Sequence, residues 1–334
     1  MRNHRRFALG LPAFALLAIA AISDVQAVDA PSTEKPKADS IAIGEADAAA
    51  KDRFRLSDLL PTAWQKRPKM RFHVYTEMTP QGRSRPEPTS TAPLTYFSPE
   101  GKYVETGWLV IAGERPPPWP QLREAMQKAL AGNSYHLIAD DRQRPDLLIV
   151  FTYGAFSTDL ASLAPPEADL PVTAEELLVY ALQDRAALKD VLDRARFIGG
   201  ARVAEELRLA LVFGSVPQLL NGSAGDKVRD IVELAFHPCY FVTATAYDFS
   251  GVEKKQKIPL WQTRMTIDTQ GVAMDEVLKP LIANTGAYLG RETPEAVIIG
   301  KRIDREGRVE VGTPTVVPDK EPKPGPAPGQ AVPR

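Results

Sequence analysis

The stretch "HPCYFVTATAYDF", residues 237–249, places the chain's only cysteine two residues after a histidine. A cysteine nucleophile needs a lowered thiol pKa and a basic partner held within reach. His237 and Cys239 are close only along the chain, with Pro238 between them, whereas catalytic pairs are usually brought together by the fold. Residues 239–249 are rich in aromatic residues, Val and Thr, which is typical of a strand. We therefore interpret Cys239 as a strand residue without a catalytic role.

The other histidines and acids form no local catalytic motif. His73, His136 and His237 lack the short spacing of metal-binding sequences. The stretch "VFGSVPQ" contains a serine but not the second glycine of a nucleophile elbow. Asp140 and Asp141 are adjacent, and adjacent residues of a strand point to opposite faces. We predict no catalytic residue, no metal site and no cofactor.

The N-terminus has the composition of an export signal. Three arginines precede the apolar stretch "FALGLPAFALLAIAAIS", and Val25 and Ala27 form a Val-x-Ala end. Gly10 and Pro12 interrupt that stretch, which is shorter than the ~20 residues of a spanning helix. We predict a cleaved signal peptide over residues 1–27, no membrane span after its removal, and a periplasmic or extracellular location in a bacterium. An uncleaved anchor is the alternative.

The charge of the chain argues against nucleic acid as a partner. Removal of residues 1–27 takes away three arginines and one aspartate, which changes the net charge from −1 to −3. Binding to a nucleic-acid backbone needs clustered Lys and Arg, and the sequence has no such stripe. We therefore expect the partner to be another envelope protein. The composition does not define the oligomeric state.

Both ends of the mature chain differ in composition from its centre. Residues 28–52 mix small, charged and Pro residues without apolar periodicity, so we expect a flexible linker. Residues 313–334 contain seven prolines, and proline removes backbone donors and fixes φ. We expect this tail to be disordered, either as an arm that reaches a partner or as an end without a role.

Residues 53–312 are expected to form a single domain that contains a helical insertion over about residues 173–236. Thr173 and Glu176 have the spacing of a capping box, which predicts that one helix begins there and continues to the Gly199-Gly200 pair. The stretches "ARVAEELRLALVF" and "GDKVRDIVELAF" predict two further helices.

The rest of the domain alternates strands with two helices. The predicted strands are residues 70–78 and 107–113, "SYHLIAD", "DLLIVFTYGAF", and a hairpin of residues 239–249 and 258–268. In the last strand Trp261, Met265 and Ile267 alternate with polar residues, so one face should be buried. Residues around 122–130 and 274–282 have helical apolar spacing. The fold class is therefore α+β, a mainly antiparallel sheet with helices packed on one face plus the insertion.

The hairpin supplies the candidate binding residues. Tyr247, Asp248 and Arg264 are polar or aromatic side chains on its strands, and we take them as candidates for specific recognition. An ion pair between Asp248 and Arg264 across the two strands is the competing role, and it would contribute under ~1 kcal/mol if exposed.

Two stretches of the sequence resemble a known kind of domain. "MQKALAGNSYHLIADDRQRPDLLIVFTYG" and the later "PLWQTRMTID" resemble small α+β domains of unknown function from the bacterial periplasm and envelope. The resemblance covers about residues 105–153 and 237–290, and it does not cover the helical stretch from about 173 to 236. It implies an envelope location and no particular activity.

The sequence favours an exported, non-enzymatic envelope protein that binds or assembles with another envelope component. A hydrolase of an envelope polymer is the first alternative, because two carboxyl groups brought together by folding could do glycoside chemistry. Acids that converge in a deep pocket would favour that alternative. A small-ligand or lipid carrier is the second, and it requires a cavity.

Overall fold

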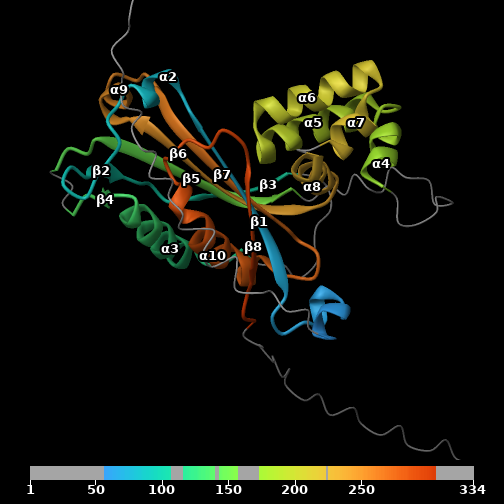
Figure 1. Ribbon diagram of the computed structural model, residues 1–334. Coiled ribbons are helices and arrows are strands. Elements are labelled where there is room, and N and C mark those ends of the chain that lie inside the picture. Colours follow the sequence, from blue (N-terminus) through green and yellow to red (C-terminus); the bar gives the residue numbers. More distant parts are fainter. Residues whose placement is uncertain (1–55, 107–115, 140–142, 157–172, 223–224, 306–334) are drawn as a thin grey trace, which may run out of the picture. The chain divides into compact units, whose positions relative to one another are not determined.

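Strands with alternating apolar and polar residues build the core of this protein. The computed structural model describes residues 56–106, 116–139, 143–156, 173–222 and 225–305, which all belong to one compact unit, Phe54–Arg334. These residues contain a mixed sheet of eight strands (Figure 1). The strands are β1 (Lys69–Met78), β2 (Leu94–Phe97), β3 (Lys102–Thr106), β4 (Tyr135–Leu137), β5 (Leu147–Phe156), β6 (Cys239–Asp248), β7 (Pro259–Asp268) and β8 (Val297–Arg302).

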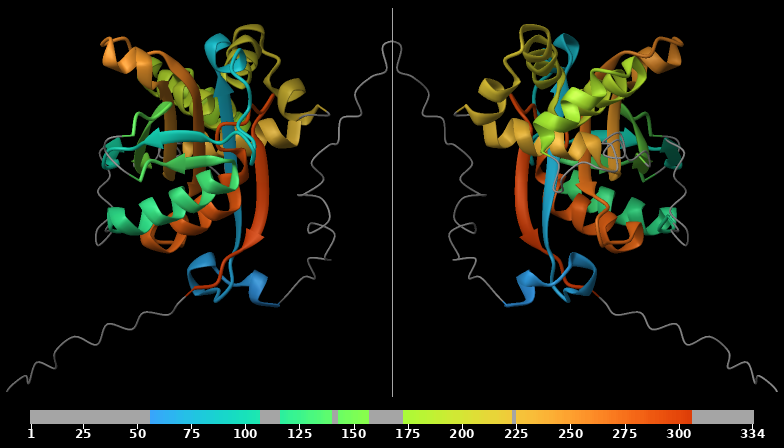
Figure 2. Two further views of the ribbon diagram at one scale, coloured as in Figure 1. Left: turned by 90° about the vertical axis from the view of Figure 1, so that its left-hand side faces the viewer. Right: turned by 90° about the vertical axis from the view of Figure 1, so that its right-hand side faces the viewer.

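The sheet has the order β4-β2-β5-β6-β7-β1-β8, and β3 also pairs with β5. The pairs β5–β6, β6–β7, β1–β7 and β1–β8 are antiparallel, whereas β2 and β3 pair in parallel with their partners. Figure 2 shows β1 and β8 side by side at one edge of the sheet. The α+β class and the mainly antiparallel sheet predicted from the sequence are confirmed.

The helices lie on both faces of the sheet (Figure 1). The helices α3 (Trp119–Gly132) and α10 (Met274–Thr285) cover one face. The other face packs against a helical group between β5 and β6, which consists of α4 (Ala174–Ala181), α5 (Arg185–Gly199), α6 (Ala201–Phe213), α7 (Val216–Asn221) and α8 (Gly225–Phe236). Short helical turns complete the described elements: α2 (Pro80–Arg83), α9 (Phe249–Glu253), η1 (Leu56–Leu59), η2 (Thr62–Trp64) and η4 (Gly286–Tyr288).

Two hydrophobic clusters hold these layers together. Phe72, Met265 and Leu278 are fully buried in the cluster between the sheet and the helices α3 and α10. On the opposite face the rings of Phe156 and Phe197 meet with their centroids 5.0 Å apart, which joins β5 to α5. Aromatic pairs at such distances add to the area term of the hydrophobic effect. The second cluster therefore fixes the helical group to the sheet.

The helical group differs from the sequence prediction at one place. The capping box of Thr173 and Glu176 starts α4 as expected, but α4 ends at Ala181 and a new helix starts at Arg185. Asp184 caps the new helix, because its carboxylate accepts hydrogen bonds from the main-chain N–H of Ala186 and Ala187, at 2.8 and 3.3 Å. The predicted single helix was wrong because an internal Asp served as an N-cap.

The other predicted elements differ less from the structure. The hairpin of β6 and β7 forms as predicted, with the short helix α9 in its connection, and the Gly199-Gly200 pair separates α5 from α6. The strands β2, β3 and β8 and the helix α7 were not predicted. The strand predicted at residues 107–113, the linker and the tail lie outside the described residues. Within the described residues, every helix is too short or too polar to cross a bilayer.

Candidate ligand-binding cleft

A cleft of about 780 Å³ lies between the sheet and the helical group. Its walls come from β1, the C-terminal end of β7, and the helices α4, α7 and α8. Polar and charged side chains predominate in its lining, which consists of Thr62, Lys69, Met70, Arg71, His73, Thr173, Ala174, Glu175, Leu177, Leu220, Asn221, Arg229, Asp230, Glu233, Leu234, His237, Asp268 and Gln270.

Strand β1 supplies one wall of the cleft by its alternation. Successive side chains of a strand point to opposite faces, so Lys69, Arg71 and His73 share one face. Phe72 points the other way, into the cluster beneath α3 and α10, and Met70 belongs to that cluster while it also lines the cleft. One strand therefore contributes apolar residues to the core and basic or polar residues to the cleft.

His73 is the most deeply buried polar side chain of the cleft. Only 4% of it is exposed, because β1 is paired on both sides, with Thr266 of β7 and Ile298 of β8 opposite His73. Its Nδ1 atom has no hydrogen-bond partner among the described residues. Burial lowers the pKa of the imidazole to about 4, more than the nearby Asp230 carboxylate raises it, so the ring is neutral at pH 7. An unpaired polar atom in such a place costs free energy unless a ligand or water satisfies it.

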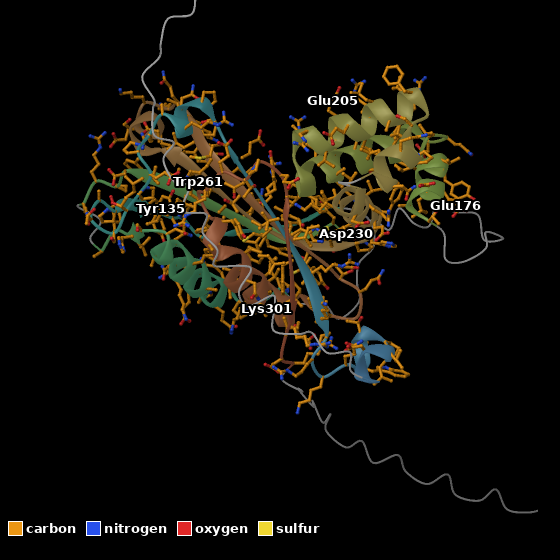
Figure 3. All side chains as sticks on the ribbon, in the orientation of Figure 1. Tyr135, Glu176, Glu205, Asp230, Trp261 and Lys301 are labelled. Carbon is orange, nitrogen blue, oxygen red and sulfur yellow. The ribbon has the colours of Figure 1, made fainter. Side chains whose placement is uncertain are left out.

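Helix α8 supplies the opposite wall. Its apolar residues Ile231, Val232 and Ala235 pack into the second cluster, and Arg229, Asp230 and Glu233 line the cleft. This division follows from the helical period of 3.6 residues. Asp230 Oδ1 lies 2.5 Å from Arg71 Nη1, so an ion pair joins α8 to β1 beside His73. Figure 3 labels Asp230.

The end of β7 and the start of β6 contribute Asp268 and His237. Burial raises the pKa of the Asp268 carboxyl above its usual value, and hydrogen bonds from the main chain together with the charge of His237 oppose that effect. Asp268 Oδ1 accepts from the N–H of Gln270 at 2.9 Å. The buried Arg194 of α5 donates to the carbonyl oxygens of Ala235 and His237, both at 3.3 Å, and so fixes the connection that carries His237.

The candidate residues of the hairpin lie away from this cleft. Tyr247 is half-buried near the end of β6, where the register shifts between Ala246 and Tyr247. Asp248 ends the same strand and caps α9, because its Oδ2 accepts from the N–H of Gly251 at 2.9 Å. Arg264 lies on β7 opposite Thr243. None of the three lines the cleft, and their role in recognition stays a prediction.

The expected ion pair between Asp248 and Arg264 was wrong. Asp248 pairs with Arg85, and Arg264 Nη2 donates to Glu77 Oε2 of β1 at 3.2 Å. The reason is the register: β6 and β7 place Thr243, five residues before Asp248, opposite Arg264. Arg264 also donates to the carbonyl oxygen of Arg196 at 3.2 Å, so it connects the sheet to α5.

Cys239 has the environment of a core residue. It is fully buried, and burial raises the pKa of its thiol to about 12. A thiol that stays protonated at neutral pH is a poor nucleophile. His136 is exposed on β4, and Asp140 and Asp141 lie outside the described residues.

Sequence reasoning missed most of the cleft. The alternation that predicted β1 already placed Lys69, Arg71 and His73 on one face, and the spacing of α8 placed Asp230 and Glu233 on its polar side. From the sequence alone these charged residues are interpreted as solvent-exposed, because the sequence does not show that this face of β1 and this side of α8 meet. The contact between α8 and β1 is tertiary, and it joins residues about 160 positions apart in the chain.

The cleft can bind a polar molecule, and its groups do not form a metal centre. The described residues contain no cluster of three or more His, Cys, Asp or Glu side chains with the geometry of a metal site. Acyl chains are poor candidates, because they would bury the charged lining without partners. The arrangement suits a ligand that supplies hydrogen bonds and charge.

Comparisons with known proteins give little further information. No family model and no curated protein matches the sequence. Among solved structures, a dodecamer of a PelC variant from Paraburkholderia phytofirmans matches at 10% sequence identity, over 66% of this chain and 97% of that chain. The TM-score of 0.27 is too low to support an inference about fold or function.

Proposed function

We propose that this protein is an exported, non-enzymatic binding protein of a bacterial envelope and that its cleft receives a polar envelope component. The observation that carries the proposal is the 780 Å³ cleft that contains the buried, unpaired Nδ1 of His73. Ligand sites are typically concave, with few well-placed polar groups, and 300–1,000 Å³ is roughly their usual size. Residues 1–27 support export.

The state of the cleft's side chains supports binding without catalysis. Asp230 is held by Arg71, and Asp268 accepts from the main chain, so both carboxylates have partners within the protein. The only thiol of the chain is buried away from the cleft lining. The polar lining favours a polar ligand over the lipid that a carrier would bind.

The proposal can be tested with the mature chain and an extract of bacterial envelope. The protein is incubated with the extract and washed, and the small molecules released on denaturation are identified by mass spectrometry. The matched variant is Leu234→Arg, which places a long side chain in the cleft, and circular dichroism verifies its fold. A compound enriched on the unmodified chain and not on the variant supports the proposal. Equal recovery from both proteins contradicts it.

A hydrolase is the second candidate, because the cleft contains four carboxyl groups, from Glu175, Asp230, Glu233 and Asp268. The raised pKa of Asp268 is the property that a general acid needs. The same extract discriminates between the two functions. A binding protein returns its ligand unchanged, whereas a hydrolase releases fragments at a rate that falls at least a hundredfold in Asp268→Asn.

A further inference from the structure

The acids of the cleft are less neutralised than its bases. Arg71 pairs with Asp230. Arg229 donates to the carbonyl oxygen of Leu220 at 2.8 Å and to Asn221 Oδ1 at 3.2 Å. The basic groups of these two side chains are therefore already engaged by the protein.

Three carboxylates of the same cleft have no cationic hydrogen-bond partner among the described residues, and that of Glu175 accepts from the neutral amide of Asn221 at 3.2 Å. Glu233 is half-buried and has no hydrogen-bond or ion-pair partner within that part of the chain. Asp268 is compensated in part, because main-chain N–H groups donate to it and the charges of His237 and Arg71 act on it. Burying carboxylates is unfavourable unless a positive charge or several donors compensate them. Glu233 is therefore the carboxylate of the cleft that most needs a positive charge from a ligand.

His73 adds an independent requirement to the same cleft. Its Nδ1 is buried and unpaired, and in a neutral imidazole one ring nitrogen accepts a hydrogen bond while the other donates. A ligand group that donates several hydrogen bonds and carries a positive charge would satisfy Nδ1 and the carboxylates together. An ammonium group has three N–H donors and no acceptor, which fits both requirements.

We propose that the cleft selects a small organic molecule with an ammonium group, held by Glu233, Asp268 and His73. This inference rests on the proposed function of the cleft as a ligand site. The volume of about 780 Å³ is much larger than one ammonium group, so the rest of the ligand would lie against the polar side chains of the rim, such as Thr62 and Gln270. An anionic ligand would face the unpaired Glu233, while Arg71 and Arg229 are already engaged by the protein, and an uncharged ligand would leave Glu233 without a partner.

Three probes with the same four-carbon chain test the charge selection: 1,4-diaminobutane, 1,4-butanediol and succinate. Binding to the mature chain is measured by isothermal titration calorimetry at pH 7. We expect saturable binding of the diamine that is at least tenfold tighter than that of the other two probes. Glu233→Gln and His73→Asn should each weaken diamine binding at least fivefold, with the melting temperature recorded to verify folding.

The matched control is Glu124→Gln, which removes an exposed carboxylate from α3 on the other side of the sheet. Diffuse attraction of a diamine to an acidic protein would respond equally to the loss of Glu124 or Glu233. Equal effects of these two variants, or equal binding of all three probes, would overturn the amine specificity. Absence of diamine binding would overturn it as well.

The outcomes also separate this inference from the proposed function. Binding of succinate or butanediol that is lost in His73→Asn would disprove the amine class while it supports a ligand site in the cleft. Failure of all three probes, together with a compound retained from the envelope extract by the unmodified chain alone, would lead to the same conclusion. Failure of both experiments would contradict the cleft as a ligand site.

Discussion

Acid should destabilise this protein through His73. The imidazole is 4% exposed, and burial lowers its pKa from the usual 6.5 to about 4. As the pH falls below 6.5, the unfolded chain takes up a proton at this residue while the folded chain does not, so unfolding becomes more favourable. The effect grows until the pH reaches about 4 and is constant below that, because both states are then protonated.

The size of the effect follows from the two pKa values. One pKa unit corresponds to ~1.4 kcal/mol, so a fall from pH 7 to pH 4 should reduce the free energy of unfolding by about 3 kcal/mol through His73 alone. A typical domain has a total stability of roughly 5–15 kcal/mol, so this single residue would remove a large fraction of it.

Urea denaturation of the unmodified chain and of His73→Asn, at pH 7, 6, 5 and 4, measures this contribution. Asn retains hydrogen-bonding capacity and does not titrate, so the variant should be less stable at pH 7 and should lose about 3 kcal/mol less on acidification. Contributions from carboxyl groups appear in both proteins and cancel in the difference. His136→Asn, in which an exposed histidine is removed, is the control for the loss of a histidine elsewhere. Parallel pH profiles of the unmodified chain and His73→Asn would show that His73 does not cause the loss of stability in acid.

Three other expectations can be tested on the same chain. Gly200 has φ of 90° and an added Cβ would lie 2.4 Å from the ring of Tyr75, whereas Gly214 has φ of 65° and open space around it. Alanine at position 214 incurs the left-handed penalty of roughly 1–2 kcal/mol, whereas Gly200, with ψ of 173°, lies in a region that essentially only glycine adopts. Gly200→Ala should therefore lower the melting temperature more than Gly214→Ala, and equal shifts would contradict this expectation. Asp184→Ala should cost about 1 kcal/mol in urea denaturation by removing the N-cap of α5, and Asp184→Asn should restore most of it. An affinity pull-down from cross-linked envelope, with and without residues 313–334, tests the tail: a partner retained only by the full chain supports a binding arm, and the same proteins in both samples would contradict it.

Local patterns predicted the parts of the fold that depend on neighbouring residues. The alternation of Trp261, Met265 and Ile267 placed these side chains on the buried face of β7, and the spacing of Leu122, Met126 and Leu130 gave the buried face of α3. Both patterns arise because a strand or helix must bury one face, and the sequence states which residues are apolar.

Features that depend on distant contacts were not predictable in the same way. The strand β8 lies at the edge of the sheet and mixes half-buried with exposed residues, so its sequence lacks a clear period. Arg264 was expected to pair within its hairpin, but its partner Glu77 lies on β1, and only the strand order brings the two together. The cleft has the same origin, because Arg71 and Asp230 meet through the packing of α8 against the sheet.

The most direct test of the proposal that the cleft binds an ammonium ligand at His73 is ¹⁵N NMR of the histidine side chains during titration with 1,4-diaminobutane. Labelling with ¹⁵N-histidine reports the ring nitrogens of His73 and His136 separately, and the two variants described above assign the signals. We expect a saturable change in the Nδ1 signal of His73, at the affinity found by calorimetry, and no change for His136. An unchanged His73 signal at saturating diamine, or equal changes at both histidines, would contradict it.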